Sequence, residues 1–161
     1  MLKQEILKIL EGDARTTPEQ IARMTGAKVD EIKQIICDAE TDRTIVRYKT
    51  VINWEKISNE RVEAIIEVKV VPQRDTGFDA IAERIYRFPE ARTVYLMSGT
   101  YDLAVLVTGK TMHQVADFVS QKLSQIDGVQ GTTTHFMLKR YKEDGAVLAG
   151  AEEIPRQQVV L

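Results

Sequence analysis

Residues 95–107 read Tyr-Leu-Met-Ser-Gly-Thr-Tyr-Asp-Leu-Ala-Val-Leu-Val, and this stretch decides the fold. Two apolar runs flank Ser98-Gly-Thr-Tyr-Asp102, which predicts a strand, a tight turn and a returning strand. Gly99 supplies the backbone freedom that such a turn needs. Asp102 can accept hydrogen bonds from backbone N–H groups or from the ammonium of a ligand. A short turn motif is weak evidence of function, so an ordinary hairpin is the simpler interpretation of these residues alone.

The segments around this hairpin extend the pattern. Residues 62–71 form another β-rich run, and residues 132–138 read as a last strand. Residues 78–88 and 111–126 carry apolar side chains at helical spacing. The resulting order is strand, helix, strand, strand, helix, strand. That order is typical of the split βαβ, or ferredoxin-like, fold.

The first fifty residues predict a helix-turn-helix unit. Residues 2–11 and roughly 28–41 have apolar stripes at helical spacing. A shorter helix opens at Thr17-Pro-Glu-Gln20, which combines a capping threonine, a proline at the first helical position and a capping box. Gly26 fits a left-handed stop to that helix. Residues 44–52 look extended and predict a strand leading out of the unit, as in a wing.

The composition is that of an ordinary soluble protein of one domain or two small ones. The chain has 161 residues, of which 43% are hydrophobic and 29% charged, and its formal net charge is −2. No overall basic field therefore points to a nucleic-acid partner. No apolar run approaches the roughly 20 residues of a membrane span, and the N-terminus has no signal-peptide core, so we expect no membrane partner. Cys37 is the only cysteine, which fits a reducing cytoplasm.

A polar connector over residues 53–60 contains the only tryptophan and marks a domain boundary, which we place near residue 55. We expect residues 1–55 to form the helix-turn-helix domain and residues 56–145 the ferredoxin-like domain. Residues 146–161 would then form a C-terminal tail, either mobile or docked on a neighbour.

Three features make the chain, up to about residue 140, similar to the Lrp/AsnC family of feast/famine transcription regulators. The first is the order of elements, and the second is Gly99-Thr-Tyr-Asp102, which matches the family's Gly-x-x-Asp turn between the middle strands. The third is Ile126-Asp-Gly-Val129 followed by Thr-Thr-Thr134, at the passage from the second helix into the last strand. The resemblance implies an α+β protein: an N-terminal winged helix-turn-helix followed by a ferredoxin-like βαββαβ effector-sensing (RAM) domain.

The resemblance also implies double-stranded DNA as a partner. The residues expected to contact DNA are Lys28, Lys33, Gln34, Arg43, Arg47 and Lys49. Lys28 departs from the family by replacing a Ser-type cap, and Arg43 stands where the family usually has a glycine. Residues 1–50 contain nine basic and nine acidic residues, so their formal charge is zero. The affinity of a protein for DNA rests largely on neutralisation of the phosphates. We therefore expect weak DNA binding, or binding that needs several helix-turn-helix domains on one DNA.

A small effector, expected to be an amino acid, is implied near the Gly-x-x-Asp turn at an interface between subunits. An amino acid needs donors for its carboxylate and an acceptor for its ammonium. Backbone N–H groups around Ser98, Gly99 and Thr100 can supply the donors, and Asp102 the acceptor. The further candidates lie on the last strand and are Thr133, Thr134 and His135.

No set of side chains predicts catalysis. His113 and His135 are the only histidines and lie on different predicted elements, so we expect no metal site and no cofactor. Cys37 is interpreted as a packing thiol. Two alternatives stay open beside the regulator: an effector-binding oligomer with a degenerate DNA-binding domain, and an enzyme similar to the sirohaem decarboxylases, which share this two-domain build.

The alternation of side chains along the strands predicts self-association. Two helices can cover only one face of a four-stranded sheet, and the strands are apolar on both faces. A soluble monomer rarely leaves so much apolar surface in water, so we expect two chains to share a sheet face in an obligate dimer. The resemblance further implies larger assemblies such as octamers. The apolar end of the tail, Val159-Val160-Leu161, is a candidate for docking on a neighbour.

Overall fold

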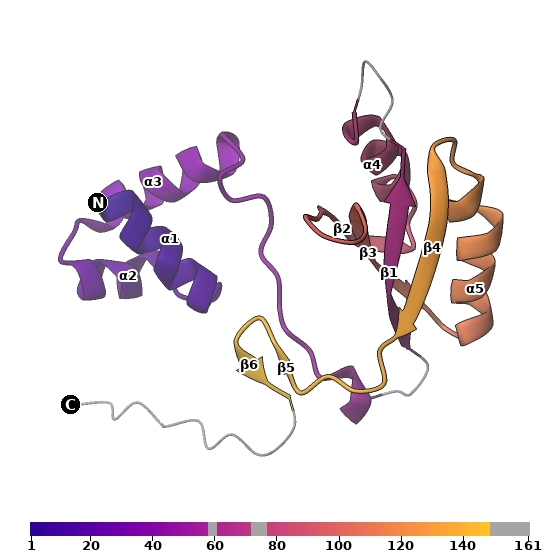
Figure 1. Ribbon diagram of the computed structural model, residues 1–161. Coiled ribbons are helices and arrows are strands. Elements are labelled where there is room, and N and C mark those ends of the chain that lie inside the picture. Colours follow the sequence, from indigo (N-terminus) through magenta and orange to yellow (C-terminus); the bar gives the residue numbers. More distant parts are fainter. Residues whose placement is uncertain (58–60, 72–76, 149–161) are drawn as a thin grey trace. The chain divides into compact units, whose positions relative to one another are not determined.

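The computed structural model describes residues 1–57, 61–71 and 77–148 of the chain, which divides into two compact units (Figure 1). The first unit is Met1–Ile52, and the second begins at Asn53. Each unit has its own hydrophobic core. The expected docking segment Val159-Val160-Leu161 lies outside the described residues.

Three helices form the first unit: α1 (Leu2–Gly12), α2 (Pro18–Thr25) and α3 (Val29–Thr41). Each contributes a stripe of apolar residues, because positions three and four apart share a helix face. The stripes meet in a buried cluster that consists of Ile6, Leu10, Ile21 and Ile32. Burying one such aliphatic side chain stabilises a domain by roughly 1.5–3 kcal/mol, so this cluster holds the three helices together.

Both ends of α2 follow the predicted capping chemistry. The N–H of Gln20 donates to the Thr17 hydroxyl (3.3 Å), and the N–H of Thr17 donates to the Gln20 side-chain oxygen (2.8 Å). Gly26 ends α2 in the left-handed conformation, with φ of 73°. The predicted capping box and glycine stop are therefore confirmed.

The strand expected over residues 44–52 is not formed. Residues 46–52 form neither helix nor strand, and the described part of the first unit contains no strand that could pair with them. A strand is defined by its ladder partner, so extended residues without one stay irregular. Immediately before this segment, Arg43 adopts a φ of 60°, and the N–H of Ile45 donates back to the carbonyl of Ala39 (2.8 Å).

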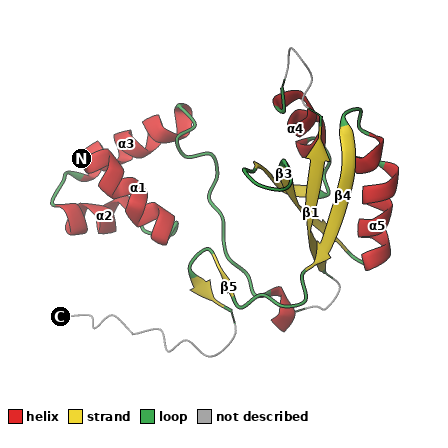
Figure 2. Cartoon of the chain, in the orientation of Figure 1, coloured by secondary structure: helices red, strands yellow, loops and turns green. Residues whose placement is uncertain are grey.

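The second unit contains a four-stranded antiparallel sheet with strand order β2-β3-β1-β4 (Figure 1), whose strands are yellow in Figure 2. Its strands are β1 (Val62–Val70), β2 (Ala91–Leu96), β3 (Leu103–Gly109) and β4 (Val129–Phe136). Its helices are α4 (Asp79–Tyr86) and α5 (Met112–Gln121), with short 3₁₀ turns η1 (Trp54–Lys56) and η2 (Leu123–Gln125). The order along the chain is that of the predicted ferredoxin-like fold.

Helices α4 and α5 pack on one face of the sheet. On β1 the side chains of Ala64, Ile66 and Val68 point toward them and are fully buried. The phenyl rings of Phe88 and Phe118 meet edge to face, with centroids 5.6 Å apart. The period-two burial along β1 fixes which face of the sheet carries the core.

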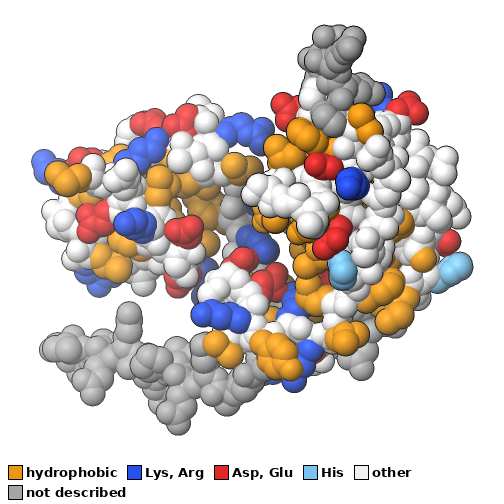
Figure 3. Space-filling view, in the orientation of Figure 1, with side chains coloured by type: hydrophobic (Ala, Val, Ile, Leu, Met, Phe, Trp, Pro, Cys, Tyr) orange, Lys and Arg blue, Asp and Glu red, His pale blue; other side chains and the backbone are white. Residues whose placement is uncertain are grey.

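The other face of the sheet, the outer face, is mixed in character. Large apolar side chains on it remain accessible, with Ile65 at 42%, Tyr95 at 61% and Met97 at 39% exposure. Glu67 and His135 lie beside them, and their side chains approach to 3.3 Å. In the space-filling view, hydrophobic side chains alternate with charged and histidine side chains over this unit (Figure 3). The outer face is thus less uniformly apolar than the strand pattern alone predicts.

A small hairpin follows β4 that the sequence analysis missed. Strands β5 (Lys142–Glu143) and β6 (Ala146–Val147) pair antiparallel. Asp144 and Gly145 connect them with φ values of 45° and 84°, as in a type I′ turn. An Asp-Gly pair is the usual signal of this turn, so the hairpin was detectable at residues 144–145.

Gly128, before β4, is the most closely packed of the described glycines in the second unit. It has a φ of 94°, and a Cβ there would lie 2.8 Å from Cδ1 of Ile81 on α4. We expect Gly128→Ala to lower the free energy of unfolding by about 2–4 kcal/mol, because backbone strain adds to overpacking. Urea denaturation followed by circular dichroism measures this change.

Gly131 provides the matched control for this substitution. It lies within β4, and a Cβ there would meet nothing within 4 Å. Gly131→Ala should leave stability unchanged or raise it by up to about 1 kcal/mol, since alanine has less backbone entropy to lose than glycine. Equal unfolding midpoints for the two variants would mean that neither the backbone conformation at residue 128 nor the contact with Ile81 costs stability.

Candidate effector loop and DNA-binding helix

Residues 98–102, which we call the effector loop, are anchored by Asp102. Its carboxylate oxygen Oδ2 accepts a hydrogen bond from the N–H of Val70 (2.8 Å). Its own N–H donates to the carbonyl of Val68 (3.1 Å), and its carbonyl accepts from the N–H of Met97 (2.8 Å). The ladder between β1 and β3 ends at the pair Val68 and Leu103, so the carboxylate supplies the acceptor that β3 does not offer to the N–H of Val70. Asp102 thus accepts from the backbone, the first of its two expected roles.

The rest of the effector loop presents free backbone donors. Ser98, Gly99 and Thr100 are all exposed. Among the described residues, no acceptor is recorded for their N–H groups. Gly99 has a φ of 155°, a conformation that side chains disfavour. Successive unpaired N–H groups in a turn form a concavity that suits a carboxylate.

The three candidates on β4 do not share one site. Thr133 and His135 lie on the outer face, whereas Thr134 is partly buried on the face toward the helices. Strand β1 separates all three from β3, which begins where the effector loop ends. With strands about 4.8 Å apart, β4 is roughly 10 Å from β3. One small ligand therefore cannot contact the effector loop and both faces of β4.

The two cations expected on α3 have different surroundings. Lys28 is the N-cap residue of α3 and is exposed, with no side-chain capping bond. The ammonium of Lys33 lies 3.4 Å from the carboxylate of Glu19 on α2. Hydrogen bonds from the backbone and from Thr17, with Lys33 adding a smaller effect, lower the pKa of Glu19. The ammonium of Lys33 already has Glu19 as a partner within the chain, so its attraction to a phosphate would be reduced.

The solvent-facing side of α3 is acidic rather than basic. Turning 100° per residue, the positions opposite the buried Ile32 and Ala39 are 30, 34, 37, 38 and 41. The amide nitrogen of Gln34 donates to Oδ1 of Asp38 (2.8 Å), which leaves the amide oxygen as an acceptor. Cys37 is exposed on this side, so the interpretation of a packing thiol is wrong.

The other expected DNA contacts follow α3. Arg43, Arg47 and Lys49 are all exposed. Just before them, the carboxylate of Asp42 accepts from the N–H of Thr44 (2.8 Å) and from the ammonium of Lys3 (3.1 Å). These bonds, those from Thr44 first, lower the pKa of Asp42 to about 2. Because the folded pKa is depressed, this contribution is complete above the ordinary carboxyl pKa and is lost as the pH falls toward 2.

The two histidines lie on different elements and have different partners, so they do not form one metal-binding set. His113 on α5 is 87% exposed and lies 3.4 Å from Asp117, whereas His135 on β4 faces Glu67. Within residues 1–57, 61–71 and 77–148, no three His, Cys, Asp or Glu side chains could hold one metal ion. No helix in that part of the chain is long and apolar enough to span a membrane.

A three-helix head and a ferredoxin-like sheet with an exposed Gly-x-x-Asp loop define the class of helix-turn-helix regulators that carry an effector domain. The model of the Lrp/AsnC ligand binding domain matches residues 63–147. The HTH-type transcriptional regulator YugG of Bacillus subtilis is 50% identical over 153 residues, covering 94% of this chain and 92% of the relative. The chain belongs to the Lrp/AsnC family.

Solved structures share the same fold. Escherichia coli AsnC matches with a TM-score of 0.67 and 19% identity, covering 88% of this chain and 93% of AsnC. A regulator of Neisseria meningitidis, solved in complex with L-methionine, matches with a TM-score of 0.70 and 20% identity, covering 88% of this chain and 91% of that regulator. At these identities the likeness establishes the fold.

The bond between Asp102 and Val70 yields a stability prediction. Asp102→Ala removes the acceptor of a nearly buried N–H group, so we expect the free energy of unfolding to fall by about 1–3 kcal/mol. Asp102→Asn keeps an acceptor oxygen and should lose less. Urea denaturation of both variants gives the comparison. An alanine variant as stable as the parent would mean that the loop does not depend on this carboxylate.

Proposed function

We propose that this protein regulates transcription by binding double-stranded DNA through its helix-turn-helix unit, in response to an amino-acid effector. The observation that carries the effector role is the row of exposed, unpaired N–H groups at Ser98, Gly99 and Thr100. The names of the relatives support the regulatory role, and two structural neighbours, from N. meningitidis and Mycobacterium tuberculosis, are complexes with L-methionine. A cytoplasmic location accompanies this function.

The effector's carboxylate would accept hydrogen bonds from the loop N–H groups, which need no induced rearrangement to donate. The ammonium requires an acceptor, and Asp102 retains Oδ1 for it because Val70 occupies Oδ2. A shallow, exposed loop covers only part of a small ligand. A second subunit over the loop would complete the enclosure, which favours a site at a subunit interface.

DNA binding by this head would depend on several weak contacts. We propose that Lys28, Lys33, Arg43, Arg47 and Lys49 meet phosphates while Gln34 reads a base edge. The free amide oxygen of Gln34 suits the exocyclic amino group of adenine or cytosine in the major groove. The carboxylate of Asp38 lies beside Gln34 and repels phosphate, so it cancels part of the attraction that the lysines and arginines provide. Two helix-turn-helix units of one oligomer, bound to the same DNA, would together provide the affinity that one unit lacks.

Self-association would bury the outer face of the sheet. Ile65 and Tyr95 are exposed at its surface, and Met97 lies at its edge. Glu67 and His135 would meet the partner's outer face as polar groups that fix the register. We propose a homodimer through this face, with larger assemblies such as octamers built from it.

Titration of fluorescent double-stranded DNA at low salt tests the regulatory function. We expect saturable binding whose affinity falls steeply as salt rises, since phosphate contacts release counterions. At least one of the twenty amino acids should change that affinity. The absence of any binding at low salt would favour an effector-binding oligomer with a degenerate DNA-binding domain.

The variant Asp38→Asn sharpens this titration. It removes one negative charge beside Gln34 and keeps an oxygen for the amide, so affinity for all sequences should rise about two- to fivefold. Asp127→Asn makes the same change on an exposed residue of the second unit and should leave affinity unchanged. Equal effects of the two substitutions would place the DNA on another surface.

Light scattering tests the proposed dimer. The parent should have at least twice the 18.2 kDa mass of one chain. Ile65→Lys places a charge in the outer face and should shift the mass toward one chain at micromolar concentration. Ile57→Lys makes the same change outside the sheet and is the control. A parent of one chain's mass would overturn both the dimer and the interface site.

A further inference from the structure

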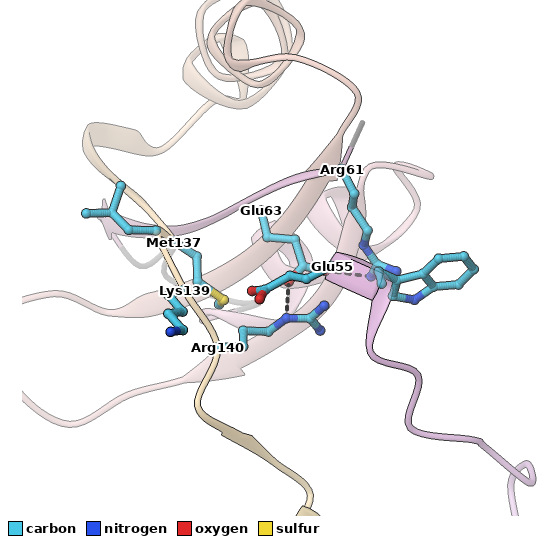
Figure 4. Close-up of a pocket in the computed structure, with 8 residues that line it drawn as sticks. Glu55, Arg61, Glu63, Met137, Lys139 and Arg140 are labelled. Atoms are coloured by element: carbon cyan, nitrogen blue, oxygen red, sulfur yellow. Dashed lines mark ion pairs between the residues drawn. The ribbon is translucent and has the colours of Figure 1, made fainter. Parts of the chain in front are cut away.

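A pocket of about 470 Å³ opens in the second unit, away from the effector loop (Figure 4). It lies between η1, the start of β1 and the segment that follows β4. The residues that line it are Trp54, Glu55, Arg61, Glu63, Met137, Leu138, Lys139 and Arg140. Glu63 is near the first residue of β1, and Val70, which Asp102 contacts, is the last. At about 3.3 Å per residue, the two sites are roughly 20 Å apart.

The floor of the pocket is a buried carboxylate held between two guanidinium groups. Glu63 is 8% exposed and is the one buried charged residue in the described core. Its Oε1 contacts Nη2 of Arg61 (2.5 Å), and its Oε2 lies 3.6 Å from Nε of Arg140. Figure 4 marks both ion pairs with dashed lines. Glu63 is thereby neutralised, and both arginines are fixed in place.

The guanidinium groups are not saturated by Glu63. A guanidinium carries five N–H donors in a fixed plane. The Nε–H of Arg61 is buried and has no hydrogen-bond partner. Arg140 donates from Nη1 to Glu143, outside the pocket lining. A buried cationic donor without an acceptor is costly, and an anion close to these groups would offset that cost.

The lining as a whole carries more positive than negative groups. Arg61, Lys139 and Arg140 face Glu55 and Glu63, and Glu63 is already paired. Arginines that present a planar fork are the usual partners of carboxylates. The charge of the lining therefore selects an anion over a cation.

The remaining surface of the pocket is apolar. The guanidinium of Arg61 stacks on the indole of Trp54, 5.5 Å from the ring centroid. Met137 contributes a flexible thioether, and Leu138, 90% exposed, stands at the rim. A ligand with a short hydrocarbon chain can cover these surfaces while its charged end meets the arginines.

We propose that this pocket is a second ligand site, which binds a small carboxylate with an aliphatic chain. Its carboxylate accepts hydrogen bonds from Arg61 and Arg140, Lys139 adds attraction at the rim, and its chain packs against Trp54 and Met137. The turn η1 begins two residues after Ile52, the end of the first unit. Occupancy of the pocket would stabilise the packing of η1 on the sheet, next to the connection between the units.

Trp54 is the only tryptophan in the chain, so intrinsic fluorescence reports directly on this pocket. The 161-residue chain is titrated with 4-methylpentanoate, with L-leucine and with 4-methylpentanamide. We expect a saturable change in emission with both carboxylates and none with the neutral amide at equal concentration. No change with either carboxylate, or an equal change with the amide, would overturn the proposal.

Three variants locate the binding. Arg140→Gln should weaken binding of 4-methylpentanoate by about tenfold or more, as expected for a lost charge-assisted hydrogen bond. Lys139→Gln leaves the Glu63 ion pairs intact and should weaken it about two- to fivefold. Lys142→Gln, on β5 and outside the lining, is the matched control.

Unchanged binding in both lining variants would assign the fluorescence change to another surface and overturn the proposal. If Arg140→Gln does not fold, Lys139→Gln compared with Lys142→Gln decides the question. The titration involves neither DNA nor the effector loop. Its failure is therefore distinguishable from failure of the proposed regulatory function.

Discussion

The second unit depends on one carboxylate that replaces a missing ladder bond. β1 lies at the centre of the sheet and pairs with both β3 and β4, and its last N–H, on Val70, lies beyond the end of the ladder to β3, whose final pair is Val68 and Leu103. A nearly buried N–H group must find an acceptor, and Asp102 supplies it from the adjacent turn. The same bond holds the effector loop in one conformation, so its N–H groups are preorganised for a ligand. Under the proposed function, structural and sensory roles therefore meet in a single side chain.

Local rules predicted most of the fold. The capping residues Thr17 and Gln20, the glycine stop at Gly26 and the alternation along β1 depend on neighbours within a few residues. The strand expected over residues 44–52 depends on a partner that no local pattern specifies, and the first unit provides none. The β5–β6 hairpin lies across the predicted domain end at residue 145, although Asp144-Gly145 is the local signal for its turn.

The candidate sites were harder to predict than the fold, because contacts between distant residues decide them. The sequence marks Asp102 as an acceptor, but only the fold brings the N–H of Val70 to it. Likewise, Lys33 meets Glu19 across a helix boundary. The pocket beneath Trp54 combines residues from both ends of the second unit, so no single motif signals it. Proximity in space, unlike periodicity, cannot be read from spacing along one chain.

Folding and the proposed DNA binding place opposite demands on Arg43. Its φ of 60° suits glycine, and a residue with a side chain costs about 1–2 kcal/mol in that conformation. A domain of this size has a total stability of only about 5–15 kcal/mol, so that cost is a real fraction of it. Glycine at this position would strengthen the first unit and remove one of its nine basic residues. Under the proposed function, stability is therefore exchanged for a cation that contacts DNA.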